Sequence, residues 1–326
     1  MTREPTSRTE APMTVISKQR LALGKAALDQ NQSPVTLQRL NQEQFQKFRS
    51  FIYDQCGIRI ESNKLTLLSN RIRRRLVVGD FVDFDDYYRF LISARGSTEL
   101  NGFLDAITTN ETFFFRTEKQ FDWMKDQWLT EQIALQRQGK RAPELRIWSA
   151  GCATGAEAYT MGICLAENHY RLNDWSLQIL ATDISEEALT TARDGVFKER
   201  TIDAVNDRQR KRFFTKVPSS DQWKVRSTLR ESVQFKQHNL LHRLDARPFD
   251  LIFIRNVLIY FDEQSKQKVI QNLIRSLADD GYLVIGPSEG VYGMLQSLQR
   301  VTPLIYRKSA KTPSTPDVKL RKGGAS

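Results

Sequence analysis

The sequence predicts an α/β fold in which a mainly parallel sheet, covered by helices on both faces, follows an all-helical segment. Up to Gln138, apolar residues recur at the three- and four-residue steps of amphipathic helices. After Pro143, short apolar runs alternate with helical patterns, which is typical of a parallel sheet. A third observation is an apolar run that passes through a glycine turn directly into a helical pattern at 145–159.

The helical segment divides into an all-α domain at 36–116 and a linker helix at 117–142. One predicted helix carries Phe45 and Ile52 on a shared face and stops at Gly57, because glycine favours helix ends. The next carries Leu68 and Leu76 on its apolar face. Further helices are expected at 83–94 and 98–108, and the linker helix runs from Glu118 towards Gln138.

The alternating part predicts one domain at 143–308. Strands are expected at 145–150, 177–182, 232–238, 250–254 and 282–285, with an edge strand at 301–306. Helices are expected at 156–170, from Ser185 onward, and at 262–277. The charged stretch 196–230 is interrupted by Pro218, and we interpret it as an inserted β-subdomain with one or two helical turns and a small hairpin.

Composition limits the class of protein. The 326 residues carry a formal net charge of +11, which favours an acidic partner such as nucleic acid, an anionic membrane surface or an acidic protein. Residues 1–35 and the basic stretch 309–326 are polar and aperiodic, and we predict that both are disordered tails. Three cysteines suit neither a disulfide framework nor a zinc site, so we expect no metal and a cytoplasmic setting. No apolar run approaches the roughly 20 residues that span a bilayer.

An arginine cluster lies beside the apolar face of the second predicted helix. Arg71, Arg74 and Arg75 share this side. The cluster is either a solvated face or a docking surface for an acidic partner.

The glycine turn LRIWSAGCATGAEAY, at 145–159, is the strongest local motif. Gly151 and Gly155 allow a sharp bend close to a ligand, and Glu157 follows at the start of the helix. This is the nucleotide-binding turn of a Rossmann-like sheet, but it lacks the third glycine of the dinucleotide fingerprint. Alone, the turn fits a structural bend as well as a nucleotide site.

Polar residues follow the next two predicted strands. Asp183 ends the second strand, where a carboxylate can accept both ribose hydroxyls of an adenosine. A carboxylate there can equally cap a helix, but Ser185 can serve as that cap and leave Asp183 available. Asn239 follows the third strand, where its amide can read an adenine edge while Leu240 packs against the ring.

Two more segments carry candidate site residues. IRNVLIYF, at 254–261, places Arg255, Asn256 and Tyr260 just past a buried strand, where they either cap the loop or line the site. TTNETFFFR, at 108–116, precedes the sheet and is too apolar for an ordinary surface loop. Its phenylalanines could also serve only to join the helical part to the sheet.

Together, TTNETFFFR, SAGCATGAEAY, LATDIS and IRNVLIYF occur in an order that resembles the chemotaxis receptor methyltransferases, the CheR family. The resemblance covers about 40–308. It implies a Rossmann-like S-adenosylmethionine-dependent methyltransferase sheet with an all-α N-terminal domain and an inserted β-subdomain. It also implies transfer of a methyl group to glutamate side chains of methyl-accepting chemotaxis receptors, with S-adenosyl-L-homocysteine as product.

The resemblance implies roles for particular residues of this chain. Arg116 and Tyr260 match residues thought to orient the reacting groups. The positions that match cofactor contacts are Asn110, Thr112, Arg116, Glu157, Asp183, Asn239, Leu240, Ile254 and Arg255. The chain departs from the family at 155–158, where Gly-Ala-Glu-Ala replaces the frequent Gly-Glu-Glu-Pro, and at 287–289, where Pro-Ser-Glu replaces His-Ser-Glu.

The chemistry implied by the resemblance needs no general base, because a glutamate carboxylate with a pKa of about 4.3 is ionised at neutral pH. An aromatic wall of residues 113–115 and Tyr260 would exclude water. Glutamate-rich receptor helices are the expected partner, docked on Arg71, Arg74 and Arg75, with the enzyme at membrane receptor arrays. Because 216–225 contains no glycine, we predict no dependence on a receptor pentapeptide tether.

Two alternatives remain at this point. A Rossmann methyltransferase acting on RNA would have stacking aromatic and basic residues around the cleft. In this sequence the basic residues cluster on a separate helix, so we expect no nucleic-acid partner. A non-catalytic, cofactor-binding signalling module would keep the fold as a scaffold. The presence of Glu157, Asp183 and Arg116 together argues against a protein that has lost its activity.

Overall fold

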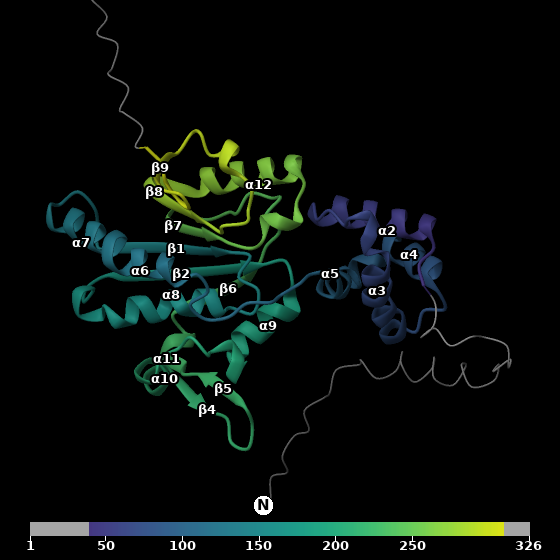
Figure 1. The fold of residues 1–326 in the computed structure, drawn as a ribbon, viewed down its shortest axis with the longest axis horizontal. Coiled ribbons are helices and arrows are strands. Elements are labelled where there is room, and N and C mark those ends of the chain that lie inside the picture. Colours follow the sequence, from purple (N-terminus) through teal and green to yellow (C-terminus); the bar gives the residue numbers. More distant parts are fainter. Residues whose placement is uncertain (1–38, 310–326) are drawn as a thin grey trace, which may run out of the picture. The chain divides into compact units, whose positions relative to one another are not determined.

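A computed structural model describes residues 39–309 of the chain (Figure 1). The tail predicted at 1–35 lies outside the described residues, as does 310–326 of the second predicted tail. Within the described range, no helix is long and apolar enough to cross a membrane.

The N-terminal part is all-helical, as predicted. Asn41 and Gln44 form a capping box at the start of the first helix, which ends at Gly57 with φ of 72°. The next helix buries Leu68 and Leu76 against its neighbours. The helices are α2 (Gln42–Cys56), α3 (Leu65–Gly79), α4 (Phe84–Ile92) and α5 (Leu100–Ile107), with short 3₁₀ turns η2 (Ser62–Lys64) and η3 (Gly96–Thr98).

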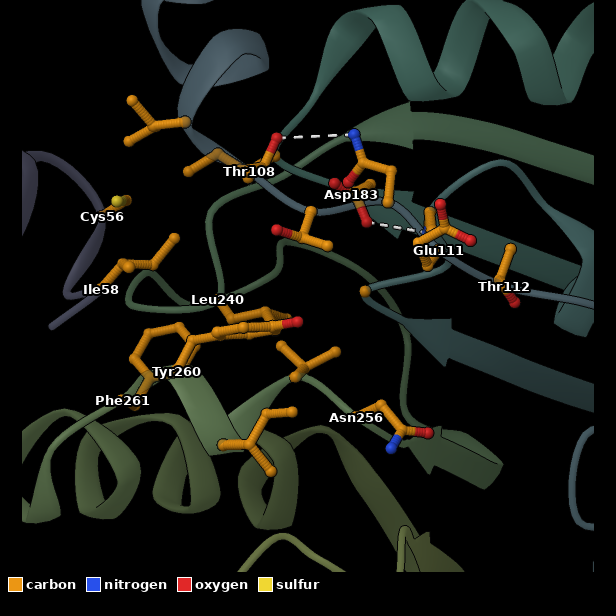
Figure 2. A pocket seen from close by; sticks show the side chains of 18 of the residues that line it. Cys56, Ile58, Thr108, Glu111, Thr112, Asp183, Leu240, Asn256, Tyr260 and Phe261 are labelled. Atoms are coloured by element: carbon orange, nitrogen blue, oxygen red, sulfur yellow. Dashed lines mark hydrogen bonds between the residues drawn. The ribbon is translucent and has the colours of Figure 1, made fainter. Parts of the chain in front are cut away.

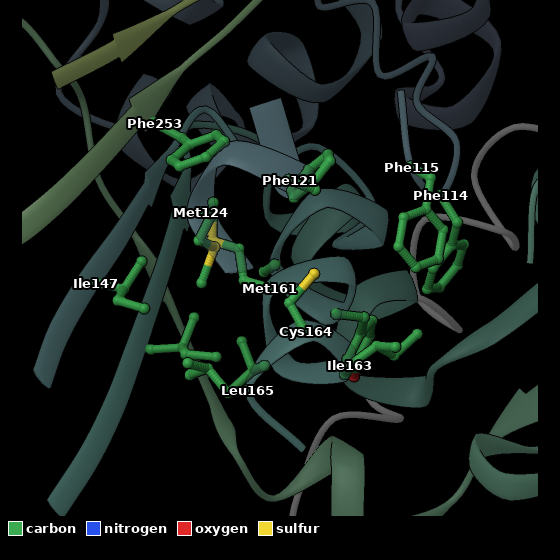
Figure 3. Packing of buried hydrophobic residues seen from close by; sticks show 14 of the residues in the cluster. Phe114, Phe115, Phe121, Met124, Ile147, Met161, Ile163, Cys164, Leu165 and Phe253 are labelled. Carbon is green, nitrogen blue, oxygen red and sulfur yellow. The ribbon is translucent and has the colours of Figure 1, made fainter. Parts of the chain in front are cut away.

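The segment predicted as a linker helix is helical but changes geometry midway. It comprises α6 (Glu118–Trp123), the π-helical η4 (Met124–Trp128) and α7 (Leu129–Arg137). Phe121 and Met124 are buried in the same hydrophobic cluster as Ile147 and Phe253 of the sheet (Figure 3). The segment therefore packs as a covering layer of the sheet.

The sheet has seven strands in the order β6-β2-β1-β7-β8-β10-β9. The first five in this order are parallel, and β10 and β9 run antiparallel. The strands are β1 (Glu144–Ala150), β2 (Ser176–Asp183), β6 (Val233–Gln237), β7 (Phe249–Ile254), β8 (Leu277–Ile285), β9 (Gln299–Thr302) and β10 (Ile305–Arg307). The single edge strand predicted at 301–306 is wrong: the chain turns at Pro303, whose fixed φ favours a turn, and forms two strands.

Helices cover both faces of this sheet (Figure 1). One face packs against α6, α7, α8 (Ala156–Glu167) and α9 (Glu186–Asp194), and the other packs against α12 (Glu263–Ser276). The parallel register places Ala150 level with Thr182 on one side and Ile254 on the other. Residues that follow these strands therefore meet at one edge of the sheet.

The insertion after α9 is a small β-subdomain. Its sheet has the order β3-β5-β4 and contains the predicted hairpin plus a third strand. That strand forms because Phe197 is buried against Phe114 and Tyr159, which draws 196–198 alongside the hairpin. The elements are β3 (Val196–Lys198), η6 (Glu199–Thr201), α10 (Asp207–Phe213), β4 (Phe214–Lys216), β5 (Gln222–Val225) and α11 (Ser227–Arg230).

Candidate functional site

A pocket of about 400 Å³ lies at the carboxyl edge of the sheet (Figure 2). This volume is in the range of small-molecule and cofactor sites. Residues that follow β1, β2, β6 and β7 line it, together with residues of the all-helical part. The residues that follow these strand ends therefore meet at one pocket, and their contact with a ligand stays a prediction.

The glycine turn forms one wall of the pocket. Gly151 has φ of 79°, and a Cβ there would lie 2.4 Å from Cγ2 of Val257. Gly155 has φ of 89°, and its Cβ would lie 2.8 Å from that of Ala192. Both positions therefore exclude a side chain on two grounds, conformation and space. The turn between them places Ala153 on the pocket wall.

Asp183 lies in the pocket wall at the end of β2 (Figure 2). Its carboxylate accepts hydrogen bonds from the backbone N–H of Ala153 at 2.8 Å and of Ser185 at 2.9 Å. Ser185 does cap α9, as expected, but it does not leave Asp183 unbound. Burial raises the pKa of Asp183, and these N–H groups oppose the shift. An ionised carboxylate can accept about four hydrogen bonds, so acceptor capacity remains.

Glu157 and Arg255 form a buried ion pair in the wall of the pocket. The carboxylate of Glu157 accepts from Oγ of Ser149 at 2.8 Å and from the guanidinium of Arg255 at 3.0 Å. The Arg255 side chain is 2% exposed, donates also to the carbonyl of Arg116, and lies over the Phe121 ring. Burial lowers the pKa of Arg255, and the charge of Glu157 opposes this. The pairing joins residues 98 positions apart, and sequence reasoning missed it.

The amide of Asn239 has a structural partner. Its Nδ2 donates to the carbonyl of Gln55 at 2.8 Å, and its Oδ1 accepts from the N–H of Leu241. It therefore ties the end of α2 to the pocket, and one N–H remains for a ligand. Leu240 lines the pocket as expected (Figure 2). Ile254 does not, because its alternating position in β7 turns its side chain into the core.

The 108–116 segment divides between pocket and core. Asn110 donates to Oγ of Ser185 at 3.1 Å and lines the pocket with Thr112. Arg116 also lines it, with its guanidinium 5.4 Å from the Phe113 ring centre. The predicted aromatic wall of 113–115 is wrong in part, because the side chains of 114–115 are buried in the hydrophobic core (Figure 3).

The loop after β7 closes the opposite wall. Tyr260 lies there with 39% of its surface exposed (Figure 2). Its carbonyl accepts from the N–H of Arg59 at 2.8 Å, and Phe261 forms an antiparallel bridge with Ile58. The loop is thus joined by its backbone to the all-helical part. Sequence reasoning missed the 58–61 wall, since neither polarity nor spacing distinguishes it.

The arginine cluster of α3 is not one surface. Arg71 reaches the pocket and donates to the carbonyl of Ile107 and to Oγ1 of Thr109 at 2.7 Å. Arg75 is paired with Glu99 at 2.7 Å. Arg74 is exposed. The prediction of a joint docking surface is therefore wrong for Arg75, which is held inside the helical part by that pair.

The donor set of the pocket fits an adenosyl cofactor. Asp183 offers oxygen acceptors, Leu240 an apolar face, and the glycine turn a close backbone approach. In the described part of the chain, no group of three or more His, Cys, Asp or Glu residues could hold a metal ion. Basic and aromatic side chains surround the cleft, an arrangement that an RNA substrate also predicts.

Comparison with known proteins identifies the family. Residues 110–304 match the family described as CheR methyltransferase, SAM binding domain, and 43–108 match CheR methyltransferase, all-alpha domain. A chemotaxis protein methyltransferase of Borreliella burgdorferi is 34% identical over 83% of this chain and 95% of its own length. The Escherichia coli protein of that name is 33% identical, over 77% and 85%. That of Salmonella typhimurium is 30% identical, over 87% and 98%.

These matches cover the all-helical part, the glycine turn, the β-subdomain and the loop after β7. Both domains of the family are present, in the order in which the fold was described. The cofactor is S-adenosylmethionine, as the pocket chemistry and the matched domain agree. The chain belongs to the CheR methyltransferase family.

Proposed function

We propose that this protein transfers a methyl group from S-adenosylmethionine to glutamate carboxylates of methyl-accepting chemotaxis receptors. The observation that carries the proposal is the pocket rim, where the Arg116 guanidinium lies over the Phe113 ring and the exposed Tyr260 lines the same pocket. This rim offers a carboxylate one cation and two apolar rings. Relatives named chemotaxis protein methyltransferase support a chemotaxis substrate.

When bound, S-adenosylmethionine supplies a methyl group on a positively charged sulfur, and the C–S electron pair stays with the sulfur as the methyl group leaves. Asp183 would hold the ribose hydroxyls, and Leu240 would pack against the adenine. Glu157 would contact the amino-acid end, because it lines the pocket at the start of α8. The ion pair with Arg255 fixes its carboxylate for that role.

The proposed reaction needs no proton acceptor, since the glutamate is ionised at neutral pH. His238 lines the pocket, but burial lowers its pKa to about 4. It is therefore neutral at physiological pH and a weak base. This suits a transfer in which the enzyme positions the reacting groups and moves no proton.

Arg116 would orient the acceptor carboxylate through its guanidinium. A clamp that held the anion too tightly would stabilise the ground state, so its contribution is alignment. Phe113 and Tyr260 would displace water from the carboxylate. Removal of water favours the reaction, because an anion and a cation combine into neutral products as the methyl group moves.

The receptor helix would approach over α3. Arg71 at the pocket and the exposed Arg74 would attract its glutamates, and Arg75 would not take part. We place the reaction in the cytoplasm, at membrane receptor arrays. The 216–225 stretch, without glycine, supports binding that does not require a pentapeptide tether.

The test is incubation of the protein with radiolabelled S-adenosylmethionine and a purified receptor cytoplasmic fragment. We expect a base-labile label on the fragment, as for a glutamate methyl ester, and no label after its methylation-site glutamates are changed to alanine. Label that resists base, or label found on added RNA, would overturn the proposal. Receptor fragments with and without a terminal pentapeptide should bind equally, which tests the tether separately.

A further inference from the structure

Glu289 is a buried carboxylate just beyond β8, outside the pocket wall. Its side chain is fully buried. One oxygen accepts from the backbone N–H of Leu258 at 2.8 Å, and the other accepts from that of Asn256. Burial raises the pKa of Glu289, and these N–H groups oppose the shift. A buried carboxylate is costly unless it is hydrogen-bonded, so these contacts hold the loop to the group.

The surroundings of Glu289 are built around its carboxylate. Asn256 has φ of 59°, a left-handed conformation that asparagine tolerates better than most residues. At Gly286, an added Cβ would lie 2.4 Å from Oε1 of Glu289. Gly286 therefore leaves space for the carboxylate, and the left-handed backbone at Asn256 directs its N–H towards it.

The loop held by Glu289 contacts both halves of the reaction site. On the cofactor side, Val257 packs against Gly151, where an added Cβ would be 2.4 Å from Cγ2 of Val257. On the acceptor side, the loop continues through the 3₁₀ turn η7 (Leu258–Tyr260) to the rim. The loop residues that line the pocket are Arg255, Asn256, Val257, Ile259, Tyr260 and Phe261.

We propose that Glu289 is a positioning residue for methyl transfer. By fixing the backbone at 256–258, its carboxylate sets Val257 against the cofactor turn and Tyr260 at the acceptor rim at the same time. The part that concerns Tyr260 rests on the proposed function. The part that concerns the cofactor turn requires only binding of S-adenosylmethionine or its product.

The test compares Glu289→Gln with a matched control, Asp250→Asn. Glutamine keeps the size of the side chain but places an NH₂ against a backbone N–H. Asp250 also accepts a backbone hydrogen bond, from Arg146 at 2.8 Å, and pairs with Arg141, but at the opposite end of β7. The control therefore removes a comparable carboxylate–backbone contact away from the pocket.

For Glu289→Gln, the Kd of S-adenosylhomocysteine by calorimetry should rise about tenfold, the loss typical of one charge-assisted hydrogen bond. The kcat on a receptor fragment should fall by about 10- to 100-fold, because small misplacements are costly in an alignment reaction. Amide hydrogen exchange at Leu258 should accelerate in the free protein. Asp250→Asn should change none of the three.

Wild-type values of Kd and kcat in Glu289→Gln would overturn the proposal; if Leu258 exchange alone accelerated, Glu289 would have a purely structural role. If wild-type protein labels no receptor glutamate, the proposed function fails, and the Kd and exchange comparison still decides the role of Glu289. If Glu289→Gln does not fold, Glu289→Asp replaces it: the shortened side chain keeps the charge, and the same three readouts should change in the same direction.

Discussion

The two ends of the pocket are built differently. At the cofactor end, Asp183 and Glu157 are held by backbone N–H groups, a serine and a buried arginine, and the glycine turn leaves no space for a side chain. At the acceptor rim, Arg116 and Tyr260 are partly exposed and have fewer contacts. The comparison indicates that the cofactor meets a preformed site, whereas the rim that we propose for the acceptor is held by fewer contacts.

The largest expected effect is at the cofactor end. Glu157→Ala leaves the Arg255 guanidinium buried without its partner, so the free energy of unfolding in a denaturant titration should fall by about 3–5 kcal/mol. Calorimetry should show loss of S-adenosylmethionine binding. Glu186→Ala is the control, because its pair with Arg193 is solvent-exposed and should contribute little. If the stability of Glu157→Ala were unchanged, the cofactor end of the pocket would be no more tightly held than the rim.

Removal of a rim side chain should affect turnover without unfolding. Arg116→Ala keeps the backbone carbonyl that Arg255 uses, so the fold and the thermal midpoint should be preserved. We expect kcat on a receptor fragment to fall by about 100-fold, or roughly 2.7 kcal/mol in activation free energy. Arg95→Ala, exposed and outside the pocket wall, is the control. Full activity of Arg116→Ala would refute its role in orientation.

The outer part of the rim should respond to salt. Initial rates with a receptor fragment should decline by about two- to fivefold between low and physiological ionic strength, as steering is screened. Arg74→Ala should weaken this dependence of the initial rate on ionic strength without loss of stability. Arg75→Ala should instead destabilise the helical part, because Glu99 loses its partner, and should leave the slope intact. A slope that is the same in wild type and Arg74→Ala would contradict docking over α3.

An effect confined to acid pH concerns His238 near the pocket. The pKa of His238 is lowered from 6.5 to about 4, so between these values the unfolded chain takes up a proton that the folded protein resists. Stability from this group is complete above pH 6.5 and is lost as pH falls towards 4. His238→Gln should therefore lose less thermal stability across this window than wild type. His169→Gln, at an exposed ring, should match wild type.

The fold was largely predictable because its signals are local. Apolar spacing located the helices of the N-terminal part, and short apolar runs located the parallel strands. The position of Asp183 after a strand placed it in the pocket, because parallel strands end at one edge. The extra strands at 196–198 and 299–302 depend on tertiary packing and pairing, which local spacing does not encode.

The partners of the site residues were less predictable. Asn239 is a plausible adenine ligand from its position, but its amide binds Gln55, 184 residues earlier. Arg71 and Arg75 lie one turn apart on α3, yet Arg75 forms an ion pair with Glu99 whereas Arg71 lines the pocket. Such choices depend on which polar groups the folded chain brings within hydrogen-bond distance, and spacing along the sequence does not determine that.

The backbone contacts between 58–59 and 260–261 have a consequence for how this family can diversify. They attach the backbone at the rim tyrosine to the helical domain, in addition to its connection with the sheet through β7. If the helical domain were exchanged for that of a relative, the position of the rim tyrosine would therefore change with it. The proposed choice of acceptor would then depend on the helical domain as well as on the sheet.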